Sequence, residues 1–400
     1  MKNILSRPVD RRCVVLVAAV FLMITVIAHL KVVRPLVLPR LIFPIESVVF
    51  GLAAKCSPGS PGWLERFSKT ATWHGGSLAG QVAYISPNGD LSHCEHGWRD
   101  QAWGEMVTPQ LRFRFASATK VLTADAILAA ALEQKLALDD PLLGYLPEVN
   151  NLADERLRDV TLRQLLNHSA GFDRSRTPDT MFMHAKTPWC PSELSNLEKV
   201  TLDFDPGARH AYGNLGYCLL GVVLERVYEE PFRALVERRY ALSDYDLKFV
   251  DGPYLSDEVQ YDFRNSDFYM ENYYRYFDFE ALSSSAGLTG SALGYAKLIN
   301  RMLARERHPL REVEADILCS RERFRSCYGH VFNIYQRPDD PLVAYIQSGN
   351  LIGASSMVMV DNHGGVLVWV GNGMPRKMQE KMDKIKDIAY GELSEYYTLH

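Results

Sequence analysis

A long apolar helix that begins at a lysine is the feature that most restricts how this sequence can fold. Between Val121 and Leu132 only Thr123 and Asp125 are polar, so no polar stripe can face water. Such a helix is expected in the interior of a globular domain. Lys120 stands at its start, where the helix dipole and burial both disfavour a positive charge. The sequence therefore predicts a buried lysine with a lowered pKa.

A second constraint is the uncharged apolar run at residues 13–30, which has about the minimum length that crosses a bilayer. Basic residues are slightly more numerous before this run than after it. Those before it are Lys2, Arg7, Arg11 and Arg12, and those after it are Lys31, Arg34 and Arg40. This bias predicts a membrane anchor over residues 1–34, with the rest of the chain in a periplasmic or other extracytoplasmic compartment. A cleaved signal peptide is the alternative, although no small-residue cleavage site follows promptly.

Residues 35–54 are also apolar, but three prolines, Arg40 and Glu46 argue against a second span. Each charge at mid-membrane costs about 2.5–3.5 kcal/mol on insertion scales. We expect an interfacial or domain-packing segment here, followed by a linker rich in proline and glycine at residues 57–63.

The cysteines and the net charge restrict the environment and the partners. Cys13 lies in the apolar run, and the other six of the 7 cysteines are Cys56, Cys94, Cys190, Cys218, Cys319 and Cys327. An even number outside the membrane predicts disulfides in an oxidising compartment, with unpaired buried thiols as the alternative. Cys319 and Cys327 are the favoured pair because the loop between them is short. A net charge of −4 gives no basic footprint, so nucleic acid is not an expected partner.

Strand patterns occur at both ends of the chain, and helical patterns lie between them. Residues 81–98 predict a β-hairpin with Asn88-Gly89 at its turn. Four further strands are predicted at 327–336, 342–348, 354–361 and 366–372, and an amphipathic helix is predicted from about residue 375. The pattern indicates an α+β domain whose antiparallel sheet is built from both chain ends, with a helical subdomain between them.

Two short motifs carry groups suited to acyl transfer. In Ser117-Ala-Thr-Lys120 a hydroxyl and an amine lie one helical turn apart, so the amine can take the serine proton. Backbone N–H groups at the helix start can stabilise an oxyanion. In Tyr212-Gly-Asn214 a phenol and a carboxamide point to the same side. The phenol can relay a proton if a neighbouring ammonium lowers its pKa.

A third motif is Gln347-Ser348-Gly349, predicted at the end of a strand. The glycine there would let the backbone of a substrate approach closely.

With these motifs the chain resembles the class C β-lactamase-like serine hydrolases of the serine β-lactamase and penicillin-binding-protein superfamily. The matching segments are FASATKVLTADAILAAALEQKLALDDPLLGYLPE, VTLRQLLNHSAGF, PGARHAYGNLGYCLLGVVLERV and GLTGSALGYAKLINRML. They occur in the family's order and the resemblance covers about residues 75–375. It implies a β-lactamase/transpeptidase-like domain over residues 75–400, after the anchor and a membrane-proximal segment and linker at 35–74. It also implies a small-molecule or peptide substrate, without a metal or cofactor.

The resemblance further implies a role for each motif. Ser117 would be the nucleophile of an acyl-enzyme, Lys120 its activator and Tyr212 the general base. The substrate-binding positions would be Asn214, Gln347, Ser348, Gly349 and Asn350. The oxyanion donors would be the backbone N–H groups of Ser117 and Asn350.

Gln347 departs from the family's pattern, which has Lys-Thr-Gly or His-x-Gly at this place. A cation there would lower the pKa of the tyrosine and hold a substrate carboxylate, whereas glutamine only forms hydrogen bonds. We therefore expect a neutral ester or amide substrate rather than an efficiently handled β-lactam or D-Ala-D-Ala peptide. The alternative is a catalytically degenerate protein that binds a cell-envelope ligand without turnover.

Three other segments contain residue types found in functional sites. We interpret His168 as a turn-stabilising residue rather than as a member of a Ser-His triad. In the HCEH segment at 93–96, alternate residues of a strand would face opposite ways, so a single metal site is not expected. The aromatic segment 254–280 either lines a cleft or packs as a lid, and we favour packing.

Overall fold

The computed structural model describes residues 11–177, 179, 187–265, 273–303, 308–311 and 319–399. Contacts divide the chain into two compact units, Met1–Val49 and Phe50–His400. This division falls between the boundaries that we predict after residues 34 and 74. Two of the basic residues invoked for the anchor, Lys2 and Arg7, lie outside the described residues.

The helices and strands have the following bounds. The helices are α1 (Arg11–Val33), α2 (Val37–Gly51), α3 (Gly62–His74), α4 (Lys120–Leu132), α5 (Leu162–Leu166), α6 (Leu215–Tyr228), α7 (Phe232–Tyr240), α8 (Ser283–Ala286), α9 (Ala292–Leu303) and α10 (Met378–Leu399). The strands are β1 (Lys55–Cys56), β2 (Gly80–Ile85), β3 (Leu91–His96), β4 (Phe113–Arg114), β5 (Lys248–Phe249), β6 (Leu288–Gly290), β7 (Asn333–Tyr335), β8 (Ala344–Leu351), β9 (Ala354–Asp361) and β10 (Val366–Gly371).

The first unit consists of α1 and most of α2. Among the described residues, α1 is the one helix that is long and apolar enough to cross a membrane. Helix α2 contains Pro44, and it covers much of the apolar segment for which we expect an interfacial or packing role.

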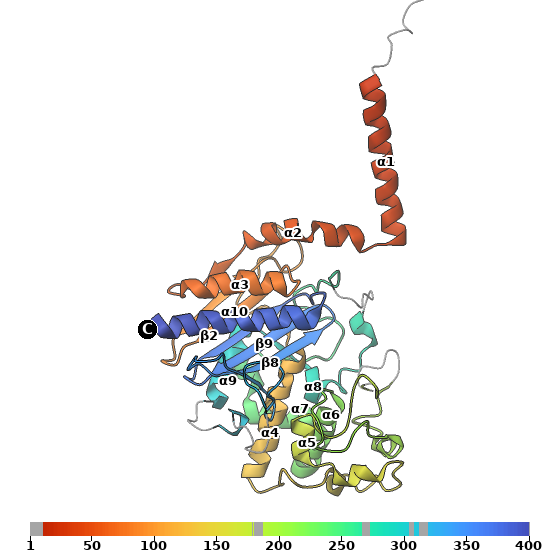
Figure 1. The fold of residues 1–400 in the computed structure, drawn as a ribbon, viewed down its shortest axis with the longest axis vertical. Coiled ribbons are helices and arrows are strands. Elements are labelled where there is room, and N and C mark those ends of the chain that lie inside the picture. The colour runs from red at the N-terminus through yellow and green to blue at the C-terminus, as the bar shows by residue number, and fades with distance from the viewer. Residues whose placement is uncertain are drawn as a thin grey trace, which may run out of the picture. The chain divides into compact units, whose positions relative to one another are not determined.

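The second unit is built around an antiparallel sheet in the order β1-β3-β2-β10-β9-β8-β7 (Figure 1). Strands from the two chain ends meet where β2 pairs with β10, Val82 lying opposite Trp369. Helices α3 and α10 run along one face of this sheet (Figure 1). A small second sheet, β4-β6-β5, contains the strand that leads into the Ser117 turn. The predicted α+β fold is confirmed.

Both faces of the sheet are buried. Successive side chains of its strands pack alternately into two different cores. In β10, Val366, Val368 and Val370 pack into the core shared with the helical middle of the chain. Leu367 and Trp369 point the other way, into the layer formed with α3 and α10. Because side chains of a strand alternate between faces, a sheet covered on both sides requires a continuously apolar strand.

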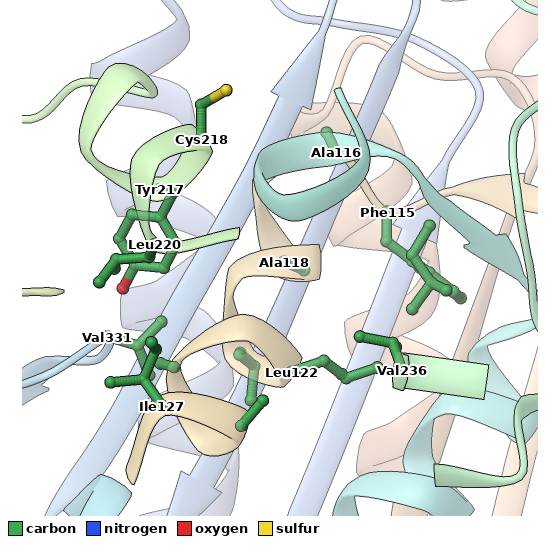
Figure 2. Packing of buried hydrophobic residues seen from close by; sticks show 14 of the residues in the cluster. Phe115, Ala116, Ala118, Leu122, Ile127, Tyr217, Cys218, Leu220, Val236 and Val331 are labelled. Carbon is green, nitrogen blue, oxygen red and sulfur yellow. The ribbon is translucent and has the colours of Figure 1, made fainter. Parts of the chain in front are cut away.

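Helix α4 lies in the centre of the helical region, as its apolar sequence predicts. Leu122 and Ile127 pack among side chains of neighbouring helices, including Tyr217 and Leu220 of α6 and Val236 of α7 (Figure 2). Lys120 at the start of α4 is 0% exposed. The prediction of a buried helix headed by a buried lysine is therefore confirmed.

Several local predictions can be compared with the structure. The hairpin with Asn88-Gly89 at its turn is confirmed, since β2 pairs with β3. The strand predicted over 327–336 is shorter, with only Asn333–Tyr335 paired to β8. The strand predicted to end at Ser348 instead continues to Leu351, because Gly349–Leu351 pair with Ala354–Ser356 across a tight turn. The sequence around Gly349 carries no alternation that would reveal this extension.

The six cysteines of the second unit form three disulfides, and Cys13 is free. The pairs are Cys56–Cys94, Cys190–Cys218 and Cys319–Cys327. The pairing of Cys319 with Cys327 agrees with the favoured prediction.

Candidate functional site

Ser117 lies in a turn with an unusual backbone. A single 3-10 turn, Ala116–Thr119, joins β4 to α4 and carries Ser117. Ala116 has a φ of 48°, in the left-handed region that residues other than glycine rarely occupy. Such a conformation persists only where the surrounding structure holds it in place.

Strand β8 approaches this turn closely at Gly349. A Cβ atom on Gly349 would lie 2.0 Å from the carbonyl oxygen of Phe115 and 2.9 Å from the backbone nitrogen of Ser117. Any side chain there would displace the turn that carries the serine. The glycine was predicted to admit a substrate backbone, but in this structure it admits the backbone of the Ser117 turn.

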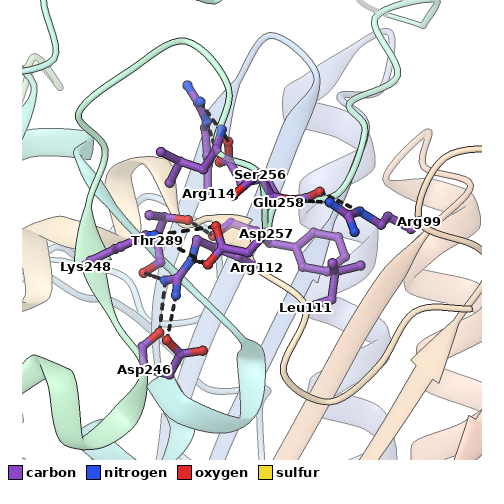
Figure 3. Close-up of polar contacts among 12 residues, drawn as sticks. Arg99, Leu111, Arg112, Arg114, Asp246, Lys248, Ser256, Asp257, Glu258 and Thr289 are labelled. Carbon is purple, nitrogen blue, oxygen red and sulfur yellow. Dashed lines mark hydrogen bonds and ion pairs between the residues drawn. The ribbon is translucent and has the colours of Figure 1, made fainter. Parts of the chain in front are cut away.

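Two buried arginines fix the segment that enters the turn (Figure 3). The guanidinium of Arg114 in β4 binds Glu258 at 2.9 Å, and both side chains are 2% exposed. Arg112 donates to the backbone oxygens of Asp246 and Thr289 and pairs with Asp257. A buried charge is stable only when its hydrogen-bonding partners stay in place. These contacts therefore hold the segment that leads into Ser117 in one position.

The amine of Lys120 has three oxygen neighbours. Its Nζ atom lies 2.6 Å from Oδ1 of Asn214, 3.0 Å from the carbonyl oxygen of Ser285 and 3.3 Å from Oγ of Ser117. Burial lowers the pKa of Lys120 to about 7; the Asp179 carboxylate opposes this shift and Arg174 adds to it. At neutral pH a large share of this amine is therefore unprotonated, and it lies at hydrogen-bond distance from the serine hydroxyl.

Asn214 is oriented by a carboxylate that sequence reasoning did not identify. Asn214 is the residue before α6, and its Nδ2 donates to Oδ2 of Asp179 at 2.8 Å. The other oxygen of Asp179 accepts from the backbone N–H groups of Asn214 and Leu215. Asp179 thus caps the start of α6 and turns the amide oxygen of Asn214 toward Lys120.

Tyr212 lies beside the same amine, and the pKa of its phenol is raised rather than lowered. The Nζ atom of Lys120 is 5.2 Å from the centre of the Tyr212 ring. Burial raises the pKa of Tyr212 to about 12, although interactions with the side chains of Ser117 and Gln347 lower it in part. The condition under which the phenol would relay a proton, a lowered pKa, is therefore not met in this structure, because burial raises the pKa.

Gln347 and its neighbours line the other side of the turn. Gln347 is 2% exposed, and its Nε2 donates to the carbonyl oxygen of Ser117 at 3.1 Å. The buried Oγ of Ser348 has no hydrogen-bond partner within the described residues. The side chain of Asn350 accepts a hydrogen bond from Ser355. Of the predicted site residues, Lys120, Tyr212, Gln347 and Gly349 therefore lie against the Ser117 turn, and Asn214 reaches it through Lys120.

Comparison with known proteins agrees with this fold. The model of the beta-lactamase family matches residues 70–390 of the chain. The chain belongs to the beta-lactamase family. A beta-lactamase/D-alanine carboxypeptidase from Yersinia pestis has the same fold, with a TM-score of 0.67 at 16% identity over 83% of this chain and 97% of that one. A D-amino acid amidase from Ochrobactrum anthropi has a TM-score of 0.64 at 17% identity, over 83% of this chain and 99% of that one.

Two curated relatives are similar in sequence to this beta-lactamase family member. The putative fimbrial assembly protein FimD, serogroup D, of Dichelobacter nodosus is 35% identical over 371 residues, which cover 92% of this chain and 93% of that protein. Esterase EstB of Burkholderia gladioli is 30% identical over 174 residues, covering 40% of this chain and 44% of the esterase.

His168 contacts the site from behind Tyr212. Its φ of 58° places it in a turn, and its carbonyl oxygen accepts from the backbone N–H of Ala211 at 2.8 Å. The imidazole packs 4.4 Å from the Tyr212 ring, centre to centre. These contacts fit the turn-stabilising interpretation and support the loop that carries Tyr212.

The aromatic segment 254–280 falls partly outside the described residues. Within the described part, Tyr261 and Tyr274 are buried, and the ring of Tyr274 lies 3.9 Å below the guanidinium of Arg114. At these positions the aromatics pack around the entry to the Ser117 turn.

Proposed function

We propose that this protein is a serine hydrolase that forms and hydrolyses an acyl-enzyme on an ester or amide. Ser117 attacks the carbonyl carbon, and Lys120 takes the proton from its hydroxyl. The C–O or C–N bond of the substrate then breaks, and the alcohol or amine leaves with that proton. Backbone N–H groups of Ser117 and Asn350 stabilise the oxyanion, and Asn214 and Ser348 contact the substrate. Water then attacks the acyl carbon and releases the acid, which restores the serine.

The observation that carries this proposal is the amine of Lys120. It is buried, it lies 3.3 Å from Oγ of Ser117, and its pKa is lowered to about 7. A general base works best when its pKa lies near the working pH and it can reach the proton it removes. The resemblance assigns the base to Tyr212, whose pKa of about 12 leaves it protonated at neutral pH. The acidities therefore favour Lys120 as the base and Tyr212 as a hydrogen-bond donor.

The proposed substrate is a neutral ester or amide. Gln347 supplies hydrogen bonds where a cation would attract a carboxylate, and it already donates to the backbone of Ser117. The partial similarity to an esterase supports the same choice.

We further propose that α1 anchors the protein in a membrane and that the catalytic domain is exported. Helix α1 is long and apolar enough to span, and three disulfides suit an oxidising compartment.

Labelling with a fluorophosphonate probe tests the acyl-enzyme mechanism. The full-length wild type in detergent should be labelled at Ser117 and should hydrolyse short-chain esters. Ser117→Ala should lose both labelling and hydrolysis while keeping the wild-type unfolding midpoint. Ser291→Ala, at a buried serine outside the site, is the control. A folded wild type that resists the probe would support the ligand-binding alternative instead.

A second candidate function is a role in fimbrial assembly. It rests on the similarity to the putative fimbrial assembly protein, which extends over 92% of this chain. In a strain lacking the gene, fimbriae should be lost and should return with the wild-type copy. Complementation with Ser117→Ala then shows whether this role needs the hydrolase site.

A further inference from the structure

Helix α2 has an apolar face that the proposed function does not use. Three large apolar side chains of α2, those of Leu41, Ile45 and Val48, are 67%, 68% and 70% exposed, and Leu52, in the turn directly after the helix, is 70% exposed. Spacings of four and three residues place Leu41, Ile45 and Val48 on one side of the helix. Phe43 and Phe50, which fall on the opposite side, are 8% and 5% exposed. The helix is therefore apolar on both faces, and one of them is uncovered.

A water-facing helix normally combines an apolar face with a polar one. In α2 the charged residues Arg40 and Glu46 lie between the two apolar faces and leave the exposed one uncharged. Several turns of exposed large apolar side chains mark a surface that binds another protein or a membrane.

The position of α2 along the chain favours a membrane. The 23 residues of α1 make a helix about 35 Å long, enough to cross a hydrocarbon core of about 30 Å. Only residues 34–36 separate α1 from α2, and three residues span at most about 11 Å. If α1 crosses the bilayer, the start of α2 cannot leave the headgroup region.

A second exposed apolar group lies close to the end of α2. Trp103 is 74% exposed, and its ring is 5.3 Å from that of Trp98, centre to centre. The Trp98 ring in turn meets the Phe50 ring edge-on at 5.0 Å. Met106, which pairs with Trp98, is 42% exposed. Tryptophan is enriched at membrane–water interfaces, where an amphipathic ring fits the headgroup level.

We propose that α2 lies in the interface of the bilayer that α1 spans, with its exposed face toward the acyl chains. Trp103, an exposed aromatic side chain of the second unit, is a separate candidate for contact with the headgroup layer. This inference rests on the membrane anchor proposed above. It adds an interfacial contact of α2 to the span.

Depth-dependent fluorescence quenching tests this proposal in the full chain. Single cysteines are introduced by Ile45→Cys, Val48→Cys or Trp103→Cys in a Cys13→Ser background, labelled with an environment-sensitive dye and reconstituted into phosphatidylcholine vesicles. Doxyl-labelled lipid should quench each label several-fold more than a label at Leu132→Cys, a 64% exposed leucine at the end of α4. Because the exposed face is uncharged, the quenching should persist in 1 M salt.

A dye on the native Cys13 separates failure of this inference from failure of the anchor. If Cys13 is quenched by doxyl lipid but the labels at positions 45 and 48 behave like the one at 132, the anchor holds and the interfacial position of α2 is wrong. If Cys13 is also unquenched, the anchor itself is wrong and this inference fails with it. Labels at 45 and 48 that resist both doxyl lipid and aqueous iodide would show that a protein surface covers α2, which also overturns the proposal.

Discussion

Burial moves the pKa values of two residues beside Ser117 in opposite directions. Burial disfavours the charged form of each group, so it lowers the pKa of the Lys120 amine to about 7 and raises that of the Tyr212 phenol to about 12. Between these values the amine is neutral and the phenol keeps its proton. One group can then accept a proton and the other can donate a hydrogen bond, which is the division of roles that acyl transfer needs.

The first prediction follows from the amine. Since only the neutral form accepts the serine proton, kcat/KM for a neutral ester should rise with pH through a limb near pH 7 and level off above it. Lys120→Ala should lower kcat/KM by about 10²–10⁴-fold and abolish this limb. Lys135→Ala, at an exposed lysine after the same helix, is the control. A limb near pH 7 that survives in Lys120→Ala would assign it to another group.

The sequence could predict Ser117 and Lys120 but not the residues that complete their surroundings. Residues three apart on a helix lie on the same face, so the hydroxyl and the amine are neighbours wherever this helix packs. Asp179 and the carbonyl oxygen of Ser285 reach Lys120 or Asn214 only through the tertiary fold. A backbone carbonyl group that contacts a site cannot be recognised from the sequence. A single aspartate in an irregular loop cannot be distinguished from other loop aspartates.

The second prediction concerns Gln347. Restoring a cation by Gln347→Lys or Gln347→His should favour an anionic ester over a neutral one by roughly 10- to 100-fold, because a charge-assisted hydrogen bond stabilises by about 1.5–3 kcal/mol. The measurement is the ratio of kcat/KM values for the two esters. Gln347→Met removes the hydrogen bond to Ser117 without adding charge, so it should reduce turnover of both and leave the ratio unchanged. An equal ratio in all variants would mean that Gln347 only supports the Ser117 turn.

At the scale of elements, the approach to Ser117 depends on a buried ion pair. Arg114 of β4 and Glu258 are each 2% exposed, and Glu258 also accepts from the hydroxyl of Tyr261. Removing one partner leaves an uncompensated buried charge, which costs about 3–5 kcal/mol in free energy of unfolding. We predict this loss for Glu258→Gln in urea unfolding, accompanied by reduced activity. The control is Glu155→Gln, whose pair with Arg158 is 55% and 70% exposed and should change stability by at most about 0.5 kcal/mol.

Elements with a clear pattern of apolar residues or a recognisable turn could be predicted from the sequence. Elements whose length depends on a partner strand could not. The buried helix α4 and the hairpin of β2 and β3 follow from composition and turn chemistry. The extension of β8 through Leu351 depends on its partner strand β9. Gly349 therefore stands inside a strand, pressed against the Ser117 turn, where sequence alone suggested a strand end.

At the scale of the whole molecule, the disulfides are distributed over distant parts of the second unit. Cys56–Cys94 joins β1 to β3, and Cys190–Cys218 ties an irregular segment to α6, which follows Asn214. Closing a loop of 28 residues stabilises by about 3–4 kcal/mol in the chain-entropy account. Structural disulfides of this kind are typical of compartments in which thiols are oxidised, which supports the proposed export.

The last prediction tests export through the cysteines and the chain's C-terminal end together. Protein taken from intact cells and denatured without reductant should react with a thiol reagent at one position, Cys13. After reduction all 7 cysteines should react, which serves as the internal control. A C-terminal fusion to an enzyme that works only outside the cytoplasm should be active, because a single span with its N-terminus inside places residue 399 outside. Seven free thiols before reduction, together with activity only from a cytoplasmic reporter, would overturn both the anchor orientation and the exported hydrolase.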